Sequence, residues 1–407
     1  MAVASYPAVP ADARLGIVLL ALAMGGFSIG TNEFAAMTLV PYFSRDLGVN
    51  EATASHAISA YAFGVVLGAP VIAVLAARFS RRALLIGLMA MYGLANVAAA
   101  LAPTFALLVG ARFLSGLPHG AYFGVASLVA ASLVPAGRRT WAVSMVMVGL
   151  TVATVAGVPL SSFLGQSVGW RWGFALVGLL SLATMALILR HAPADRPDRS
   201  ANPLRELSAL ANRRVWMTLA VAAIGFGGMF AVYTYVASTL LEVTRAPEWV
   251  VPLMFMVFGA GMVTGTLVVG RHADRVGLLR ISILIQCAAV AMLLVYPFTV
   301  GSVWLMAPCL FAIGATGSLG LPLQTRLMDV AGHAQTLAAA LNHSAFNLAN
   351  ALGPLFAAAA INRGYGFPSS GFVGAALALA GLALLILNLW DDRRLRRAGG
   401  GSLQPGE

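Results

Sequence analysis

The sequence contains no lysine, and few of its residues carry charge of either sign. Charged side chains make up 10% of the 407 residues, whereas a soluble domain carries about 25%. Hydrophobic residues make up 60% of the chain, so the composition argues against a soluble protein and indicates an integral membrane protein. All 25 basic residues are arginine and only 14 residues are acidic, which gives a net charge of +11.

Cysteine is also scarce, since Cys287 and Cys309 are the only two and both fall in apolar stretches. They offer neither a disulfide framework nor a cluster of metal ligands. The sequence has no catalytic triad, zinc-ligand spacing or phosphate-binding loop, and its glycine-rich stretches suit close packing of membrane helices. We therefore expect no enzyme activity, no metal and no cofactor. A signal peptide is not expected either, because the N-terminus lacks a basic region and the first apolar stretch is too long.

Twelve apolar segments can be marked, and a helix of about 20 residues at about 1.5 Å each spans a bilayer. Only helices satisfy their own backbone groups in lipid, and a β-barrel would show a weaker alternating pattern. The sequence therefore predicts an all-α membrane protein with twelve transmembrane helices. The segments are Leu15–Val40, Ala52–Ala76, Ala83–Leu101, Phe105–Leu133, Trp141–Leu164, Trp172–Leu189, Val215–Leu241, Trp249–Val269, Ile281–Val300, Val303–Leu327, Thr336–Ile361 and Gly371–Trp390.

The arginines between these segments predict the orientation. If both termini are cytoplasmic, four arginines lie outside: Arg45, Arg171, Arg245 and Arg363. Arg112 is the one arginine placed in the interior of a segment, whereas Arg326, the next-to-last residue of segment ten, is counted as cytoplasmic. The positive-inside rule supports this orientation, which also explains the basic composition without a nucleic-acid partner. The cytoplasmic arginines are then Arg14, Arg78, Arg81, Arg82, Arg138, Arg139, Arg190, Arg196, Arg199, Arg205, Arg213, Arg214, Arg271, Arg275, Arg280, Arg326, Arg393, Arg394, Arg396 and Arg397.

The longest polar stretch, 191–214, divides the chain into an N-terminal bundle (1–190) and a C-terminal bundle with a cytoplasmic tail (215–407). Two motifs recur at nearly the same offset. Arg78 and Arg275 are 197 residues apart, and Gly157-Val158-Pro159 stands 196 residues before Gly353-Pro354. Parallel six-helix repeats joined by a linker are typical of large transporters. In segments five and eleven, we expect Gly157, Pro159, Gly353 and Pro354 to act as hinges, because proline removes a backbone donor and glycine lacks Cβ.

At several of these motifs the chain resembles the major facilitator superfamily and, within it, the twelve-helix drug–proton antiporters. Residues 270–277 (Gly-Arg-His-Ala-Asp-Arg-Val-Gly) are similar to the family's loop signature, 112–116 to its segment-four signature and 157–159 to its antiporter signature. Residues 30–34 are similar to the segment-one signature of the arabinose efflux permease and chloramphenicol efflux proteins, and residues 115–125 resemble the arabinose efflux permease most closely. The resemblance implies two six-helix bundles that export a solute in exchange for protons by alternating access.

The first copy of the loop signature departs from the family pattern. Ala77 stands where the family usually has an acid, and Ser80 stands where it usually has glycine. The family's cytoplasmic gating contact is attributed partly to that acid. We therefore expect gating residues at Arg78 and, above all, at Asp274 and Arg275, as a breakable ion pair beside a helix end.

Glu33 is the only acid that we place inside a membrane segment, where a charged carboxylate is costly. It is a candidate proton carrier; the alternative is a protonated side chain bonded to a neighbouring helix. Arg112 stays charged and needs a partner, so we expect it to couple to Glu33, unless it is a fixed tie between helices. His119 lies seven residues further on the same face and is a third candidate for proton coupling, although Pro118-His119 could mark a kink.

Segment eleven carries a polar stripe at positions i, i+4 and i+7, and in lipid such a face should turn toward a cavity or another helix. Neutral polar groups and aromatic rings elsewhere could line the same cavity, although each aromatic could equally serve packing. We predict a substrate cavity lined by Asn32, Tyr122, Phe123, Tyr233, His343, Asn347 and Asn350.

Together these features predict a proton-coupled efflux transporter of the bacterial inner membrane. It would act as a monomer surrounded by lipid and export a small organic solute, sugar-like or drug-like. A proton-independent uniporter or importer, and less so a non-transporting membrane receptor, are the alternatives.

Overall fold

The computed structural model describes residues 12–49, 51–54, 56–75, 79–195, 207–247, 249–332 and 334–398, and no strand occurs within these ranges. The helices follow the apolar segments, because a helix pairs each backbone group within its own segment. Their bounds are α1 Asp12–Asp46, α2 Glu51–Ala54, α3 His56–Leu75, α4 Arg81–Ala100, α5 Phe105–Ser132, α6 Arg139–Val152, α7 Val158–Ser167, α8 Trp170–His191, α10 Ser208–Ala211, α11 Arg213–Ala220, α12 Gly227–Tyr233, α13 Val236–Ser238, α14 Val250–Val276, α15 Leu278–Val295, α16 Val303–Thr316, α17 Gly320–Val330, α18 Gln335–Ala360 and α19 Ser369–Ala398.

Ten stretches of the described chain are long and apolar enough to cross a membrane. The remaining two predicted segments correspond to α3, whose apolar part is His56–Ile72, and to the 26-residue α18, which carries the polar stripe. The predicted all-α membrane fold is therefore confirmed. Several segments contain more than one described helix; in segment five, for example, a π-helical turn at Ala153–Gly157 joins α6 to α7.

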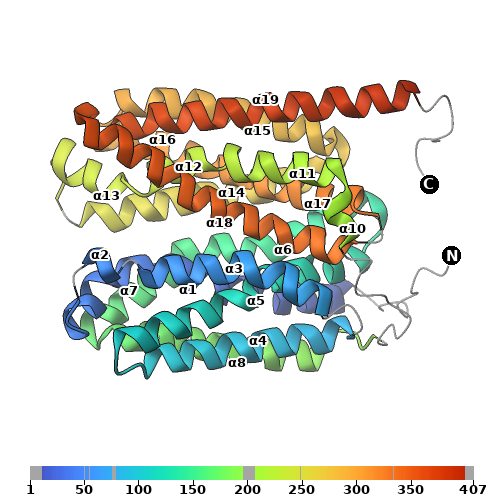
Figure 1. Cartoon of the computed structure of the whole chain (residues 1–407), viewed down its shortest axis with the longest axis horizontal. Helices are drawn as coiled ribbons and strands as arrows, with labels where there is room; N and C mark the ends of the chain where they lie inside the picture. Colours follow the sequence, from blue (N-terminus) through green and yellow to red (C-terminus); the bar gives the residue numbers. More distant parts are fainter. Residues whose placement is uncertain are drawn as a thin grey trace.

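The helices form two layers, α1–α8 in one and α10–α19 in the other (Figure 1). At one end, on the right of Figure 1, lie α10 and α17; α4 and α6 begin at this end with paired arginines, so we call it the arginine-rich end. At the opposite end lie α2, α7 and α13. The two layers meet where α6 packs against α14 and where α18 packs against α3 and α5.

The sequence repeat is visible in how helices cross within each half. A Cβ added to Gly64 on α3 would lie 2.3 Å from the Phe113 carbonyl oxygen of α5. A Cβ added to Gly261 on α14 would lie 2.0 Å from the Phe311 carbonyl oxygen of α16. Real Cβ atoms do not approach an oxygen so closely, so both crossings require glycine. The glycines are 197 positions apart and the phenylalanines 198, which places the same crossing in both halves.

Candidate functional site

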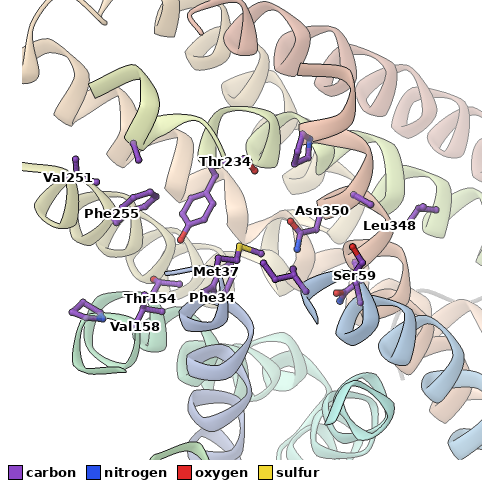
Figure 2. Close-up of a pocket in the computed structure, with 18 of the residues that line it drawn as sticks. Phe34, Met37, Ser59, Thr154, Val158, Thr234, Val251, Phe255, Leu348 and Asn350 are labelled. Carbon is purple, nitrogen blue, oxygen red and sulfur yellow. The ribbon is translucent and has the colours of Figure 1, made fainter. Parts of the chain in front are cut away.

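A cavity of about 1040 Å³ lies between the two halves, toward the end where α2, α7 and α13 lie. It is large enough to enclose a drug-sized molecule. Figure 2 shows Phe34 and Met37 of α1 facing it from one half, with Phe255 of α14 and Asn350 of α18 facing it from the other. Most of the described lining residues are apolar, and none of them is acidic, arginine or histidine. The polar ones are Ser59, Thr154, Tyr233, Thr234, Asn347 and Asn350.

Three of the residues predicted to line a substrate cavity lie in the wall of this cavity: Tyr233, Asn347 and Asn350. The Asn347 side chain donates from Nδ2 to the backbone carbonyl oxygen of His343 at 3.0 Å. Its Oδ1 atom is buried and has no hydrogen-bond partner among the described residues. This oxygen is therefore available to accept a hydrogen bond from a bound solute.

A second, smaller cavity of about 70 Å³ is lined by acidic and histidine side chains, which are absent from the described lining of the large cavity. Glu33, His119 and His343 line it, and Phe34 and Asn347 line both cavities. Such a volume holds about two water molecules. Phe34 makes an edge-on contact with Tyr233 across the two halves, with ring centroids 5.9 Å apart. Glu33 is 9% exposed and lies behind this contact, on the small-cavity side.

Arg112 is almost completely buried in α5, but its closest partner is not Glu33. Its Nη1 atom donates to Oδ1 of Asn32 at 2.6 Å, and its guanidinium group lies 4.4 Å from the centre of the Tyr61 ring. Within the described residues no ion pair joins Arg112 to Glu33, so the direct contact expected from sequence is absent in this conformation. The Nη2 atom of Arg112 has no partner among the described residues.

The hydrogen bonds continue from Asn32 through two tyrosines that the sequence reasoning did not single out. Asn32 Nδ2 donates to the Tyr92 hydroxyl at 2.8 Å, which lies 3.3 Å from the Tyr61 hydroxyl. Tyr61 Oη is 2.8 Å from Nδ1 of His119. The signal for both tyrosines was a phenolic hydroxyl in the middle of an apolar segment, where it must find a partner.

His119 then meets the other half of the molecule. Its Nε2 atom lies 3.3 Å from Nδ1 of His343 on α18. The His343 ring also stacks on Phe123, with centroids 4.3 Å apart and planes 10° apart. His119 and His343 thus form a direct polar contact between α5 and α18, beside the cavity that holds Glu33.

Three predicted cavity residues have other surroundings, so this part of the prediction differs from the structure. Asn32 is 1% exposed and bridges Arg112 to Tyr92 within the N-terminal half. The Tyr122 hydroxyl donates to the Leu22 carbonyl oxygen at 2.8 Å. Phe123 is fully buried against His343. Because their partners are other helices, these side chains hold the bundle together and do not face the large cavity.

The halves are joined at the arginine-rich end. Asp274, in the last turns of α14, accepts hydrogen bonds from the backbone N–H of Thr140 at 3.2 Å and from its hydroxyl. Thr140 lies in the first turn of α6, where unpaired N–H groups favour a carboxylate. Arg139 beside it pairs with Asp329 of α17 at 3.2 Å. The expected Asp274–Arg275 ion pair is not formed, because Asp274 faces the other half whereas Arg275 is exposed.

Two residues of the first loop signature, Ala77 and Arg78, lie outside the described residues. Next to them, the backbone N–H groups of Arg81 and Arg82 donate to Asp195 at 2.6 and 3.1 Å. The carboxylate at the start of α4 therefore comes from the linker that follows α8, whereas the carboxylate at the start of α6 comes from the opposite half.

The predicted hinge of segment five coincides with an irregularity of the helix. The π-helical turn Ala153–Gly157 inserts an extra residue, and α7 restarts with Pro159 in its first turn. A Cβ added to Gly157 would lie 2.0 Å from the Thr31 hydroxyl oxygen of α1. This turn therefore combines a local bend with close packing against the helix that carries Glu33.

In segment eleven, α18 continues through Gly353 and Pro354. A Cβ added to Gly353 would lie 2.3 Å from the Gly227 carbonyl oxygen of α12. The Tyr235 hydroxyl donates to the Pro354 carbonyl oxygen at 3.3 Å. These residues hold α18 close to the helix that contributes Tyr233 to the cavity.

Arg112 is not the only arginine buried inside a helix. Arg326 of α17, expected in a cytoplasmic loop, is 8% exposed and pairs through both terminal nitrogens with Asp392 of α19, at 3.1 and 3.2 Å. Arg326 lies at the arginine-rich end of the C-terminal half, where it joins α17 to α19.

Residues 22–354 match the sequence model of the Major Facilitator Superfamily. The chain is 37% identical to the inner membrane transport protein YdhP of Escherichia coli K12, over 92% of this chain and 96% of that protein. It is 34% identical to a chloramphenicol resistance protein of Streptomyces lividans, over 91% and 95%. Among solved structures it resembles the proton:xylose symporter XylE, with a TM-score of 0.75, 15% identity and coverage of 92% and 95%.

Proposed function

Because the chain belongs to the major facilitator superfamily, we propose that this transporter exports a small organic solute in exchange for protons. The observation that carries the proposal is the position of Glu33. Its carboxyl group lies in an enclosed cavity between the large cavity and the closed, arginine-rich end, with Arg112 held on the adjacent residue, Asn32. A carboxyl group so placed can change its protonation with the conformation of the two halves.

We assign the arginine-rich end to the cytoplasm by the positive-inside rule. Both termini and the linker 191–214 are then cytoplasmic, and the large cavity opens outward. The relative YdhP is named an inner membrane transport protein, which supports the same location for this chain. The contacts of Thr140 with Asp274 and of Arg139 with Asp329 then close the cytoplasmic side. They must break when the cavity opens inward, so Asp274 is a gating residue in this proposal.

The exchange follows from the environment of Glu33 in the two conformations. With the cavity open outward, Glu33 makes no ion pair with Arg112 within the described residues, and its burial favours the neutral, protonated form. When the halves rock and the cytoplasmic side opens, water and the Arg112 charge favour the ionised form, so the proton leaves inward. The solute then binds from the cytoplasm and is carried outward on the return step.

The lining of the large cavity favours an uncharged, largely apolar solute with a few polar groups. Phe34, Phe255 and Tyr233 offer rings, while Asn347 and Asn350 offer amides for orientation. A sugar would present many hydroxyl groups to this mostly apolar wall and leave them without partners. The drug-like alternative is therefore preferred to the sugar-like one, in keeping with the relative that is named for chloramphenicol resistance.

The test is solute uptake into inverted membrane vesicles under an imposed proton gradient, with radiolabelled chloramphenicol as the first probe. We expect Glu33→Gln to remove the proton-driven component, because an amide cannot carry the proton. Glu242→Gln, which changes an exposed acid near the opposite end, should transport like the wild type. Wild-type proton-driven uptake by Glu33→Gln would show that Glu33 takes no part in coupling.

A further inference from the structure

A chain of hydrogen-bonding groups runs through the N-terminal half and crosses into the C-terminal half at its last contact. We propose that this last contact, between His119 and His343, is a latch that links the position of the Arg112 side chain to the closure of the two halves. The proposal rests on the proposed proton-coupled function and adds coupling residues to it. The groups follow one another in the order Arg112, Asn32, Tyr92, Tyr61, His119 and His343.

One arrangement of the donors runs in a single direction from Arg112 to His343 and makes every contact of this chain. Arginine is a donor only, so the Asn32 oxygen accepts and its NH₂ group donates to Tyr92. In this arrangement Tyr92 donates to Tyr61 and not to the Ile29 carbonyl oxygen, which lies 3.4 Å away, and Tyr61 donates to Nδ1 of His119. His119 then carries its proton on Nε2, which donates to Nδ1 of His343. Aligned hydrogen bonds polarise and strengthen one another, so a change at one end affects the other.

The first and last groups of this hydrogen-bonded chain each have a nitrogen atom without a partner among the described residues. Nη2 of Arg112 and Nε2 of His343 are buried and have no hydrogen-bond partner among the described residues. A network that served only to hold helices together would be expected to satisfy its buried ends. The free donor belongs to Arg112 of α5, whose partner Asn32 directly precedes Glu33 on α1, and it has the chemistry required to bind the Glu33 carboxylate after a small shift. This is the observation that favours a switching network over a fixed tie.

The latch lies where the halves must separate. A Cβ added to Gly120, next to His119, would lie 3.1 Å from the Ala340 carbonyl oxygen, so α5 and α18 approach closely at this level. Ser127 of α5 and Gln324 of α17 make a further contact between the halves at 3.4 Å. Opening of the arginine-rich end moves these helices apart. The contact between His119 and His343, at 3.3 Å, then breaks.

Loss of the latch changes what Arg112 can bind. Without His343 as acceptor, His119 and Tyr61 can reorient, and the polarisation that holds Asn32 toward Arg112 weakens. Arg112 can then turn to Glu33, and an ion pair favours the ionised carboxylate, which releases its proton. In the reverse direction, a protonated Glu33 leaves Arg112 on Asn32, the chain forms, and the latch closes. The proton state and the conformation are thereby linked in both directions.

The titratable groups around Glu33 come from five helices. In the N-terminal half these groups are Arg112 of α5, Tyr61 of α3 and Tyr92 of α4. Tyr233 of α12 lies across the interface, in the C-terminal half. The two histidines line the same small cavity from α5 and α18. Protonation of both histidines would break the latch in acid, because two imidazolium groups cannot share a hydrogen bond, so opening that increases with pH is attributed to Glu33 and not to the histidines.

The experiment measures opening of the arginine-rich end in the full chain without a solute. Spin labels are placed through Ala136→Cys and Val276→Cys, at exposed sites on the two halves, after Cys287→Ser and Cys309→Ala. The label-to-label distance distribution is recorded between about pH 5.5 and pH 8, where we expect the open population to rise roughly tenfold. Glu33→Gln should keep this end closed at every pH.

Tyr61→Phe removes the hydroxyl that joins Tyr92 to His119 but keeps the ring beneath Arg112. We expect the pH response to fall below about twofold. Tyr122→Phe is the matched control, since its buried hydroxyl bonds only to Leu22 in the same half, and it should respond like the wild type. His343→Leu should behave like Tyr61→Phe, whereas His343→Asn, which keeps a polar group near the Nδ1 position, should recover part of the response.

Three outcomes have distinct meanings. A wild-type pH response in Tyr61→Phe and in His343→Leu overturns the latch, even if Glu33→Gln has lost its response and the proposed function stands. An unchanged response in Glu33→Gln overturns the coupling role of Glu33 itself. Loss of the response in Tyr122→Phe would also contradict the latch, because removal of any buried hydroxyl would then suffice.

Discussion

The two halves of this transporter share a scaffold but differ in their buried chemistry. A Cβ added to Gly116 would lie 2.2 Å from the Tyr61 carbonyl oxygen, and one added to Gly314 would lie 2.1 Å from that of Phe258. The two crossings therefore correspond residue by residue. At these equivalent positions the N-terminal half has a tyrosine within a hydrogen-bonded chain, and the C-terminal half has a phenylalanine in the core.

The same register pairs Arg112 with Leu310. Both lie four positions before the glycine of their crossing, and their exposures are 1% and 0%. Residues 215–241, which form the segment equivalent to that of Glu33, contain no acid. The close helix packing is thus the same in both halves, whereas the charged residues Glu33 and Arg112 are present in the N-terminal half and have no charged counterparts in the other. In the proposed mechanism Glu33 is the proton site of one half and faces neutral polar and aromatic groups of the other, so one half would carry the proton while both shape the cavity.

Arg112→Leu, which gives the N-terminal half the residue of its counterpart, should have the largest effect. Asn32 loses its charged partner, and Glu33 loses the cation that favours its ionised form. We expect proton-driven uptake in inverted vesicles to fall roughly 100-fold, equivalent to about 3 kcal/mol. Leu310→Met, a volume-conserving change at the equivalent position, should keep uptake close to the wild-type rate.

If Arg112→Leu transports at the wild-type rate while it is normally folded and inserted, the polar chain is only a structural tie. The difference between the halves would then have no part in coupling.

Substitutions at the shared crossings should affect both halves alike. Gly64→Ala and Gly261→Ala each force a methyl group against a carbonyl oxygen, at 2.3 and 2.0 Å. Overpacking of this kind costs about 1–3 kcal/mol, so both variants should melt several degrees lower in detergent. Gly87→Ala on α4, where an added Cβ meets nothing within 4 Å, should be neutral or slightly stabilising. A large loss in one half alone would show that the halves do not share this packing.

The scaffold was accessible from the sequence because its signals are local. Hydrophobic length predicted the helices, and two motifs at offsets of 196 and 197 residues predicted the repeat. Glu33 could also be found, since an acid is costly among apolar residues. The same local signals located the cavity residues of segment eleven, where three polar side chains share a face.

The connections of the site could not be predicted in this way. Each partner of Asn32 comes from a different helix, α5 for Arg112 and α4 for Tyr92, and its direction depends on how those helices rotate when they pack. Asp274 likewise bonds to Thr140, 134 positions away, and not to its neighbour Arg275. Such pairings follow from tertiary contacts that sequence spacing does not record.

Ionic ties offer a finer comparison of the halves. In the C-terminal half, Arg326 and Asp392 join α17 to α19 with side-chain exposures of 10% and 17%. In the N-terminal half, Asp46 binds Arg171 and the Trp170 indole N–H, joining α1 to α8 at the opposite end. The side chains of Arg171 and Asp46 are 40% and 47% exposed. Removal of one partner of a buried pair costs several kcal/mol, whereas exposed pairs contribute about 0–1 kcal/mol.

Asp46→Asn should therefore have the smallest effect and a characteristic pH profile. The hydrogen bond from Arg171, aided by that from Trp170, keeps the pKa of Asp46 below its usual value of 3.8. The folded state then binds the proton less readily than the unfolded state, so the tie stabilises the protein above that value and is lost as pH falls through the folded pKa. In thermal unfolding, Asp46→Asn should be less stable than the wild type by under ~1 kcal/mol at pH 7, and the difference should shrink and then vanish as the pH falls through the lowered pKa of Asp46. A difference that persisted unchanged in acid would mean that the carboxylate charge is not what joins α1 to α8.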